Sequence, residues 1–269
     1  MSTSDGGTGY EYNRTPLAVN DGWIHRPTEA GLLEIRALMK HLRKDGLFLD
    51  IGTGMGIVPR FVKGLGIHTI SVDSEVAAGR SALENVRLAG VEALPCDVTK
   101  ERLPVEDGTV DCVLFADVIE HLLHSPKPAL MEIHRVLKPG GVCIATTPNA
   151  LRLTVRLRVL AGYSNWANID EYFDRDFHAG HHHEYTIEEF KGAFTRTGFE
   201  IAEFALYEDS LRNVKIEGLR HLKTQDRSRS AVISEPFTVK IGKRLLRTLT
   251  DAFPRLRSNM LLTARKRRE

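Results

Sequence analysis

The sequence lacks a long apolar segment. No run approaches the roughly 20 consecutive apolar residues that a helix needs to cross a bilayer. The first ten residues, MSTSDGGTGY, have neither the basic flank nor the apolar core of a signal peptide. Cysteine is scarce too: Cys96, Cys112 and Cys143 are scattered and odd in number, which argues against a disulfide scaffold. We therefore expect a protein of the reducing cytoplasm.

An excess of one charge sign is also lacking overall, since the formal net charge is only +2. The distribution is uneven, however: residues 211–269 hold 16 Lys and Arg against 5 Asp and Glu, whereas residues 1–210 hold 21 against 30. The basic C-terminal region is either a solvated face or a contact surface for an anionic membrane or partner. It lacks aromatic residues interleaved with its charges, which argues against nucleic-acid binding.

Short apolar runs alternate with helical patterns through most of the 269 residues. Such alternation, with nearly continuous apolar strands, predicts a parallel sheet covered on both faces. We expect helices from Thr28, at 75–90, from the end of strand 111–117 through Val136, and at 186–198. The predicted strands are the run LFLDIGTGMG as it enters its glycine turn, and residues 68–73, 93–97, 111–117, 141–148, 199–207 and 259–266.

A flexible N-terminal arm or lid is expected at residues 1–27, followed by one domain over 28–269 with insertions at 149–185 and 208–257. In the first insertion, LRLTVRLRVL fits either a strand or a lid helix. In the second, we expect a helix that covers the sheet, because the last strand must return to the core. The alternative is a helix on a membrane surface. Its apolar face holds Ile241, Leu245, Leu246, Leu249 and Phe253, and its basic face holds Lys240, Lys243, Arg244 and Arg247.

The glycine turn after the first strand reads DIGTGMG, residues 50–56. A dinucleotide fingerprint needs a glycine where Ile57 stands, and the Lys-Ser/Thr of a phosphate-binding loop is missing as well. Acids end three successive strands at Asp50, Asp73 and Asp97, where they either cap the next helix or bind a ligand. An acid after the second strand can accept both hydroxyls of a ribose. The pattern indicates a nucleoside ligand without a pyrophosphate.

Together DIGTGMG, SVDSE, LPCDV, DCVLFADVIEHL, LKPGG and TTPN resemble the class I S-adenosylmethionine-dependent methyltransferases. Within that class they are similar to the small-molecule group that includes the ubiquinone-biosynthesis O-methyltransferases. The resemblance covers roughly residues 28–207 and the final strand. It implies an α/β, Rossmann-like, seven-stranded and mostly parallel sheet, with strand order 3-2-1-4-5-7-6, helices on both faces and only the seventh strand antiparallel. The implied cofactor is S-adenosyl-L-methionine.

The resemblance also assigns cofactor-binding residues. Its glycines would lie under the methionine part of the cofactor, and the three acids would serve the loop and ammonium, the ribose and the adenine amine. The amide after the third strand would face an adenine nitrogen, and the carbonyl that ends the fourth strand would contact the ammonium. The glycines are Gly52, Gly54 and Gly56, and the acids are Asp50 for the loop and ammonium, Asp73 for the ribose and Asp97 for the adenine amine. The amide is that of Val98 and the carbonyl that of Ala116.

The octapeptide DVIEHLLH, residues 117–124, follows the fourth strand, and we expect it to begin a helix near Asp117. Its order does not reproduce a zinc-hydrolase motif. The resemblance implies a carboxylate-x-x-Glu-His pattern associated with metal binding, here Asp117, Glu120 and His121, where a divalent cation such as Mg²⁺ could hold a hydroxylate. The alternative is that Glu120 and His121 only hold the cofactor loops by local hydrogen bonds.

Two histidines are candidate general bases, a role for which imidazole suits neutral pH. One is His121. The other is His181, at the start of HHHEY, which resembles an H-x-x-E-Y segment on the acceptor side of many relatives. Residues 149–185 would then form an acceptor-side lid.

The expected function is methylation of a hydroxyl on a small-molecule acceptor such as a sugar, a quinone or a lipid-linked compound. Candidate bases favour oxygen, as does FADV in place of the N-P-P-Y/F-type signature of N-methylation. The alternatives are an N- or C-methyltransferase, and a non-catalytic protein that binds the cofactor or a nucleic acid.

Overall fold

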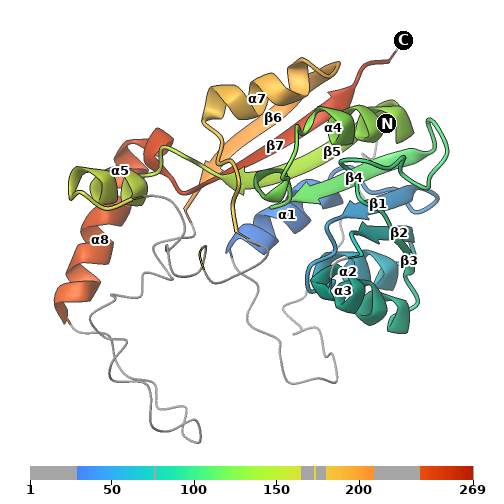
Figure 1. Ribbon diagram of the computed structural model, residues 1–269, viewed down its shortest axis with the longest axis horizontal. Coiled ribbons are helices and arrows are strands. Elements are labelled where there is room, and N and C mark those ends of the chain that lie inside the picture. The colour runs from blue at the N-terminus through green and yellow to red at the C-terminus, as the bar shows by residue number, and fades with distance from the viewer. Residues whose placement is uncertain (1–28, 76, 165–172, 174–179, 209–236, 269) are drawn as a thin grey trace, which may run out of the picture.

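The computed structural model describes residues 29–75, 77–164, 173, 180–208 and 237–268 (Figure 1). The expected N-terminal arm, Thr28, residues 165–172 and 174–179 of the first insertion and residues 209–236 of the second lie outside this part of the chain. Among the described helices, none combines the length and apolar character needed to cross a bilayer.

A 7-stranded sheet forms the centre of the molecule, in the order β3-β2-β1-β4-β5-β7-β6. All neighbours run parallel except β7, which is antiparallel to both β5 and β6. This confirms the predicted α/β Rossmann-like fold and its strand order. The strands are β1 (Leu47–Ile51), β2 (His68–Asp73), β3 (Glu92–Pro95), β4 (Val110–Ala116), β5 (Leu137–Pro148), β6 (Phe199–Tyr207) and β7 (Asn259–Lys266).

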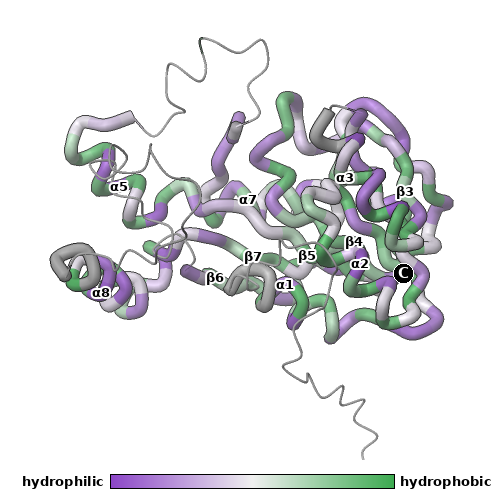
Figure 2. The backbone as a smooth tube through the Cα atoms, turned by 90° about the horizontal axis from the view of Figure 1, so that it is seen from below, coloured by the Kyte–Doolittle hydropathy of each residue, from purple (hydrophilic) through white to green (hydrophobic). Residues whose placement is uncertain are grey.

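Helices cover both faces of the sheet (Figure 1). On one face, α4 and α7 pack against a buried cluster that includes Phe115, Ile133 and Phe190. On the other, Leu38 of α1 and Val62 of α2 belong to a second buried cluster that includes Phe48 of β1, so hydrophobic residues gather along the central strands (Figure 2). The helices are α1 (Glu29–Met39), α2 (Ile57–Gly64), α3 (Ala77–Leu88), α4 (Lys127–Val136), α5 (Leu153–Leu160), α7 (Ile187–Thr195) and α8 (Phe237–Ala252), with short 3₁₀ helices η1 (Ile119–His121) and η4 (Pro254–Leu256).

The segment after β4 differs from the prediction. Instead of one helix from Asp117 to Val136, the chain forms η1, extends at Leu122, and begins α4 only at Lys127. The backbone of Asp117 has a φ of 51°, a left-handed conformation outside the right-handed α region, so Asp117 is not itself part of a helix. The octapeptide is therefore a tight turn across the end of the sheet rather than a helical face.

Other boundaries were predicted within a few residues. The third strand is 92–95 rather than 93–97, and the fifth begins at 137 rather than 141, because LKPGG already pairs with the neighbouring strand at Val110. The ambiguous run LRLTVRLRVL contains helix α5, and α2, directly after the glycine turn, was not predicted.

Helix α8 does not cover the sheet with its apolar face, so that expectation was wrong. Ile241, Leu245 and Leu249 remain 51%, 60% and 37% exposed, and Figure 1 shows the helix extending away from the strands. The final strand still returns to the core, because η4 and the following turn reverse the chain before β7. The prediction assumed that α8 must pack on the sheet for the chain to reach β7. In the structure, η4 and the turn after it bring the chain back instead.

Helix α7 begins with a capping box formed by Thr186 and Glu189. The Thr186 hydroxyl accepts a hydrogen bond from the Glu189 amide at 3.2 Å, and the Glu189 carboxylate accepts one from the Thr186 amide at 2.8 Å. This reciprocal pair satisfies two amides that a helix start otherwise leaves without a partner.

We predict that Thr186→Ala lowers the free energy of unfolding by about 1 kcal/mol, the usual cost of losing such a cap. The free energy of unfolding is measured by urea denaturation. Thr186→Ser is the matched control, because serine keeps the hydroxyl and should unfold near the wild-type midpoint. Equal losses in both variants would contradict the assignment.

Candidate functional site

The glycine turn between β1 and α2 has a backbone that only glycine adopts readily. Gly52, Gly54 and Gly56 have φ values of 80°, 51° and 69°. The Gly52 amide donates a hydrogen bond to the Val72 carbonyl at 2.9 Å, and the Gly56 amide donates to the Thr53 carbonyl at 2.8 Å. The first bond holds the turn against the end of β2, and the second closes the turn on itself.

The three glycines differ in what surrounds them. A Cβ atom at Gly52 would lie 2.3 Å from the Val118 side chain, and one at Gly56 would lie 2.3 Å from the Val86 side chain. At Gly54 the nearest atom would be 3.9 Å away. Gly52 and Gly56 are thus required by internal packing, whereas Gly54 leaves the top of the turn open for a ligand to approach.

Asp50 lies beneath this turn and is only 3% exposed. Its carboxylate accepts a hydrogen bond from the Ser71 hydroxyl on β2 at 3.0 Å. Burial raises the pKa of Asp50 to about 7; the Ser71 hydrogen bond opposes that shift, and the nearby Asp73 carboxylate adds to it. A cation placed at this end of β1 would favour the ionised form of Asp50.

The other predicted cofactor residues lie at neighbouring strand ends, because β3, β2, β1 and β4 are adjacent and parallel. Asp73 ends β2 and accepts a hydrogen bond from the Ser74 amide at 2.8 Å. Ala116 ends β4, and Val98, 8% exposed, follows β3. All of these positions therefore lie along the carboxyl edge of the sheet, where open α/β sheets bind ligands.

Asp97 has local partners of its own. One carboxylate oxygen accepts from the Thr99 hydroxyl at 2.6 Å and the Thr99 amide at 3.0 Å, and the other lies 3.0 Å from the Lys100 ammonium. Burial opposes ionisation, but these hydrogen bonds outweigh it and lower the pKa of Asp97. Asp97 thus stabilises the turn after β3, where no helix follows before β4 among the described residues.

Asp117, the first residue of the octapeptide, turns toward β5. Its amide donates to the Thr146 carbonyl at 3.0 Å, and its carboxylate accepts from the Thr146 hydroxyl, also at 3.0 Å. Glu34 of α1, 9% exposed, lies 3.2 Å from the same hydroxyl. The sequence analysis did not identify Glu34, although a lone acid within the apolar stripe of α1 was a signal for it.

Glu120 is the most buried acid of the site, with 1% exposure. One oxygen of its carboxyl group accepts from the Thr147 hydroxyl at 2.9 Å; the other, Oε1, is buried without a hydrogen-bond partner among the described residues. Burial, and then the charge of Asp117, raises the pKa of Glu120 to about 7. The carboxyl group can therefore gain or lose a proton near neutral pH.

Residues 180–185, here called the histidine loop, are fixed to the turn at Glu120 by backbone hydrogen bonds. The amides of His182 and His183 donate to the Glu120 carbonyl at 2.7 and 3.3 Å, and the Ala150 amide donates to the Tyr185 carbonyl at 2.9 Å. As a result, the rings of His121 and His181 lie 4.8 Å apart in an edge-to-face arrangement. The structure thus brings together the two predicted bases, although they are far apart in sequence.

The two rings have different partners. The Nδ1 atom of His121 lies 3.2 Å from the Gly180 carbonyl, which can only accept, so Nδ1 carries the proton in this contact. The Nδ1 atom of His181 lies 2.8 Å from the Glu184 carboxylate. That hydrogen bond raises the pKa of His181 above its usual value. With Nδ1 as donor, the lone pair of each neutral ring is on Nε2.

Glu184 is itself held by an arginine. The Arg152 guanidinium, at the start of α5, donates to both Glu184 oxygens, at 2.5 and 3.1 Å. Burial opposes ionisation of Glu184, but the hydrogen bonds from His181 and Arg152 lower its pKa to about 2. Arg152 was not predicted as a site residue, because nothing in LRLTVRLRVL distinguishes it from Arg156 and Arg158.

A metal ion would find a different ligand set from the one predicted. The nearby donor atoms belong to Glu120, His121 and His181, which lie within 4.8 Å of one another, whereas Asp117 bonds to Thr146. One carboxylate and two imidazoles do not suit Mg²⁺, which takes oxygen ligands; they suit a transition metal. The residues therefore do not fit the magnesium ion that the resemblance implied.

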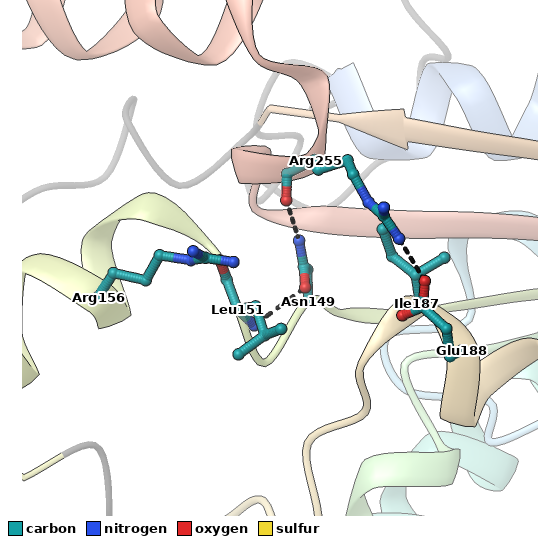
Figure 3. A pocket seen from close by; sticks show the side chains of 6 residues that line it. All are labelled: Asn149, Leu151, Arg156, Ile187, Glu188 and Arg255. Atoms are coloured by element: carbon teal, nitrogen blue, oxygen red, sulfur yellow. Dashed lines mark hydrogen bonds and ion pairs between the residues drawn. The ribbon is translucent and has the colours of Figure 1, made fainter.

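A separate cavity of about 210 Å³ lies beyond the end of β5, between the starts of α5 and α7 (Figure 3). Its upper wall is Arg255, which pairs with Glu188 and whose carbonyl accepts from the Asn149 side chain at 3.0 Å. Arg156 extends along the opposite side (Figure 3). The cavity is lined by residues between β5 and α5, from α5 itself, from the start of α7 and from η4, and by none of the glycine turn.

Comparison with known proteins agrees with this geometry. A methyltransferase domain family model matches residues 49–145. A ubiquinone biosynthesis O-methyltransferase from Maricaulis maris is 33% identical over 107 residues, 39% of this chain and 42% of that protein. A ubiquinone/menaquinone biosynthesis C-methyltransferase from Desulfotalea psychrophila is 32% identical over 114 residues, 39% of this chain and 43% of that protein. The matches thus span less than half the length of these relatives.

A similar solved structure is a SAM-dependent methyltransferase from Archaeoglobus fulgidus, with a TM-score of 0.55 and 19% identity over 87% of this chain and 93% of that chain. At this identity the likeness shows the fold. The strand order agrees with that fold, and the match to a methyltransferase domain is confined to residues 49–145. The named relatives include both an O- and a C-methyltransferase, so the accepting atom does not follow from similarity.

We predict that Gly54→Ala weakens binding of S-adenosylmethionine by at least tenfold, because a methyl group there would occupy the open top of the turn. Isothermal calorimetry measures the affinity. Gly66→Ala is the matched control: Gly66 also has a positive φ, 80°, with nothing within 4 Å of its Cβ position. Both variants should lose about 1–2 kcal/mol of stability from backbone strain, but only Gly54→Ala should lose affinity. Unchanged affinity would place the cofactor elsewhere.

Proposed function

We propose that this chain is an S-adenosylmethionine-dependent O-methyltransferase that acts on a hydroxyl of a small molecule. The observation that carries the proposal is the chain of contacts from Arg152 through Glu184 to His181. It sets an ionised carboxylate behind an imidazole, as in enzymes that need a general base. A hydroxyl is a poor nucleophile until a base removes its proton.

Cofactor binding is assigned to the carboxyl edge of the sheet. The open turn at Gly54 would receive the methionine part, the acidic end of β1 at Asp50 would attract the ammonium, and Asp73 would accept hydrogen bonds from the ribose hydroxyls. Asp97 and Val98 would line the adenine side, with Ala116 at the ammonium. When bound, the cofactor supplies an electrophilic methyl group on a sulfonium.

His181 is proposed to accept the acceptor's proton at Nε2 while the new carbon–oxygen bond forms and the carbon–sulfur bond breaks. Glu184 holds the opposite nitrogen as the donor and stabilises the imidazolium that results. His121 lies against the same ring and would orient the acceptor through its own Nε2. In-line displacement depends mainly on such positioning.

Glu120 would tune this step rather than carry it out. Its carboxyl group is buried beside both imidazoles, and ionisation of Glu120 favours the protonated form of His181. A transition metal held by Glu120, His121 and His181 is the second candidate arrangement, and the buried Oε1 of Glu120 supports it. The two arrangements differ in one measurement, since only the second predicts loss of activity in a chelator.

We predict that His181→Ala lowers kcat by about 10²–10⁴-fold, the usual contribution of a general base, with little change in cofactor affinity. His124→Ala is the matched control, because His124 is exposed at the end of the same octapeptide. A loss of similar size in His121→Ala alone would reassign the base. Steady-state kinetics with a hydroxyl acceptor, in the presence and absence of a chelator, measures each outcome.

We also predict a distinctive pH profile. A base must be neutral to act, so kcat should rise with pH through an apparent pKa above the usual value of roughly 6.5 for histidine, because the Glu184 hydrogen bond raises the pKa of His181. Glu184→Gln removes that charge and should move the rising limb to lower pH while lowering the plateau. A limb that does not move would contradict the role of Glu184.

A further inference from the structure

Helix α8 carries an exposed apolar line. Ile241, Leu245 and Leu249 recur every fourth residue and therefore follow one another along one face of the helix. They are 51%, 60% and 37% exposed. Phe253, one residue beyond the helix, is 60% exposed and continues the line. An apolar row of this length on the surface indicates a contact with something else.

The remaining described surface of the helix is mainly basic, and its one acid, Asp251, lies in the last turn and pairs with Arg257. Lys243, Arg244 and Arg247 lie away from the apolar row, and residues 241–250 contain no acid. We call these three residues together with the apolar row the α8 surface. A helix with an apolar face beside Lys and Arg is typical of segments that lie in a membrane interface.

The base of the helix is firmly held. Thr250 is fully buried, and the Arg257 guanidinium donates hydrogen bonds to the carbonyls of Thr250 and Leu206, at 3.3 and 3.0 Å. These contacts fix the last turn of α8 to the end of β6. The apolar row is thus presented by an anchored helix that extends away from the sheet (Figure 1).

A second helix presents similar side chains at the same end of the molecule. In α5, Leu157, Val159 and Leu160 are 45%, 56% and 84% exposed, next to the exposed Arg156 and Arg158. Figures 1 and 2 both place α5 and α8 at one end of the long axis, opposite α2 and α3. Apolar and basic groups therefore gather at one end of the chain.

We propose that the α8 surface docks the protein on an anionic lipid membrane. The apolar row would enter the boundary between headgroups and acyl chains, and the basic residues would bind the headgroups. A second copy of the chain fits less well, because pairing two α8 surfaces would bring like charges together. A nucleic acid fits less well too, because it offers no apolar partner for the row. The proposal does not depend on methyl transfer.

The test is sedimentation of the whole protein with vesicles. We expect binding to vesicles of phosphatidylcholine with phosphatidylglycerol, and much weaker binding to phosphatidylcholine alone. Raising the salt from about 0.1 to 1 M should weaken it, because that shortens the screening length from about 10 to 3 Å. Failure to bind the anionic vesicles would overturn the proposal, as would binding to an acidic polypeptide or DNA without binding to vesicles.

Substitutions on α8 test the apolar row and the basic residues of the α8 surface separately. Leu245→Ser with Leu249→Ser should weaken vesicle binding on the order of tenfold, and Arg244→Gln should weaken it about fivefold. Leu88→Ser is the matched control, because Leu88 is an 89% exposed leucine on α3 and should bind like the wild type. Circular dichroism and cofactor affinity should be unchanged in all variants. Equal binding by the α8 variants and the control would overturn the proposal.

Discussion

The hydrogen bond from the His182 amide to the Glu120 carbonyl, at 2.7 Å, is the contact on which the proposed acceptor site depends. It joins the turn after β4 to a loop from the acceptor-side insertion, and the bond from the Ala150 amide to the Tyr185 carbonyl fixes the other end of that loop. Because backbone groups make these bonds, the position of His181 depends little on its own side chain. The histidine is thus placed by the fold before any ligand binds.

Two carboxyl groups then give that histidine its properties, and their environments differ. Glu184 is ionised, since hydrogen bonds from His181 and Arg152 hold its pKa at about 2 despite burial. Glu120 is buried beside Asp117, and its pKa is raised to about 7. Acids whose pKa values are driven apart in one site can take separate roles. In the proposed mechanism Glu184 would orient His181 and favour its charged form, while Glu120 would respond to pH or to a cation.

Much of the fold could be predicted from the sequence because it depends on local signals. Apolar runs bounded by glycine indicated the strands, DIGTGMG indicated the ligand turn, and the resemblance implied the strand order that the structure confirms. The turn at Asp117 could not be predicted, because a left-handed aspartate has no sequence signature and the following residues are compatible with a helix. Nor could the Arg152–Glu184 pair, which exists only because α5 and the histidine loop meet in the folded chain.

For helix α8, the amphipathic sequence pattern was not enough to predict what the helix contacts. Periodicity identified both of its faces, but a pattern does not say whether an apolar face meets the sheet or another surface. The anchored last turn and the exposed row decide this in the structure. The proposed docking at that end of the molecule would also bring the cavity lined by Arg156 and Arg255 toward the lipid.

The central claim is that the accepting atom is oxygen. The most direct measurement is to incubate the protein with S-adenosylmethionine carrying a ¹³C-labelled methyl group and a panel of hydroxyl, amine and activated-carbon acceptors, then to locate the label by NMR. The account predicts methyl label on oxygen alone, and loss of that product in His181→Ala. Label found only on nitrogen or carbon would contradict it.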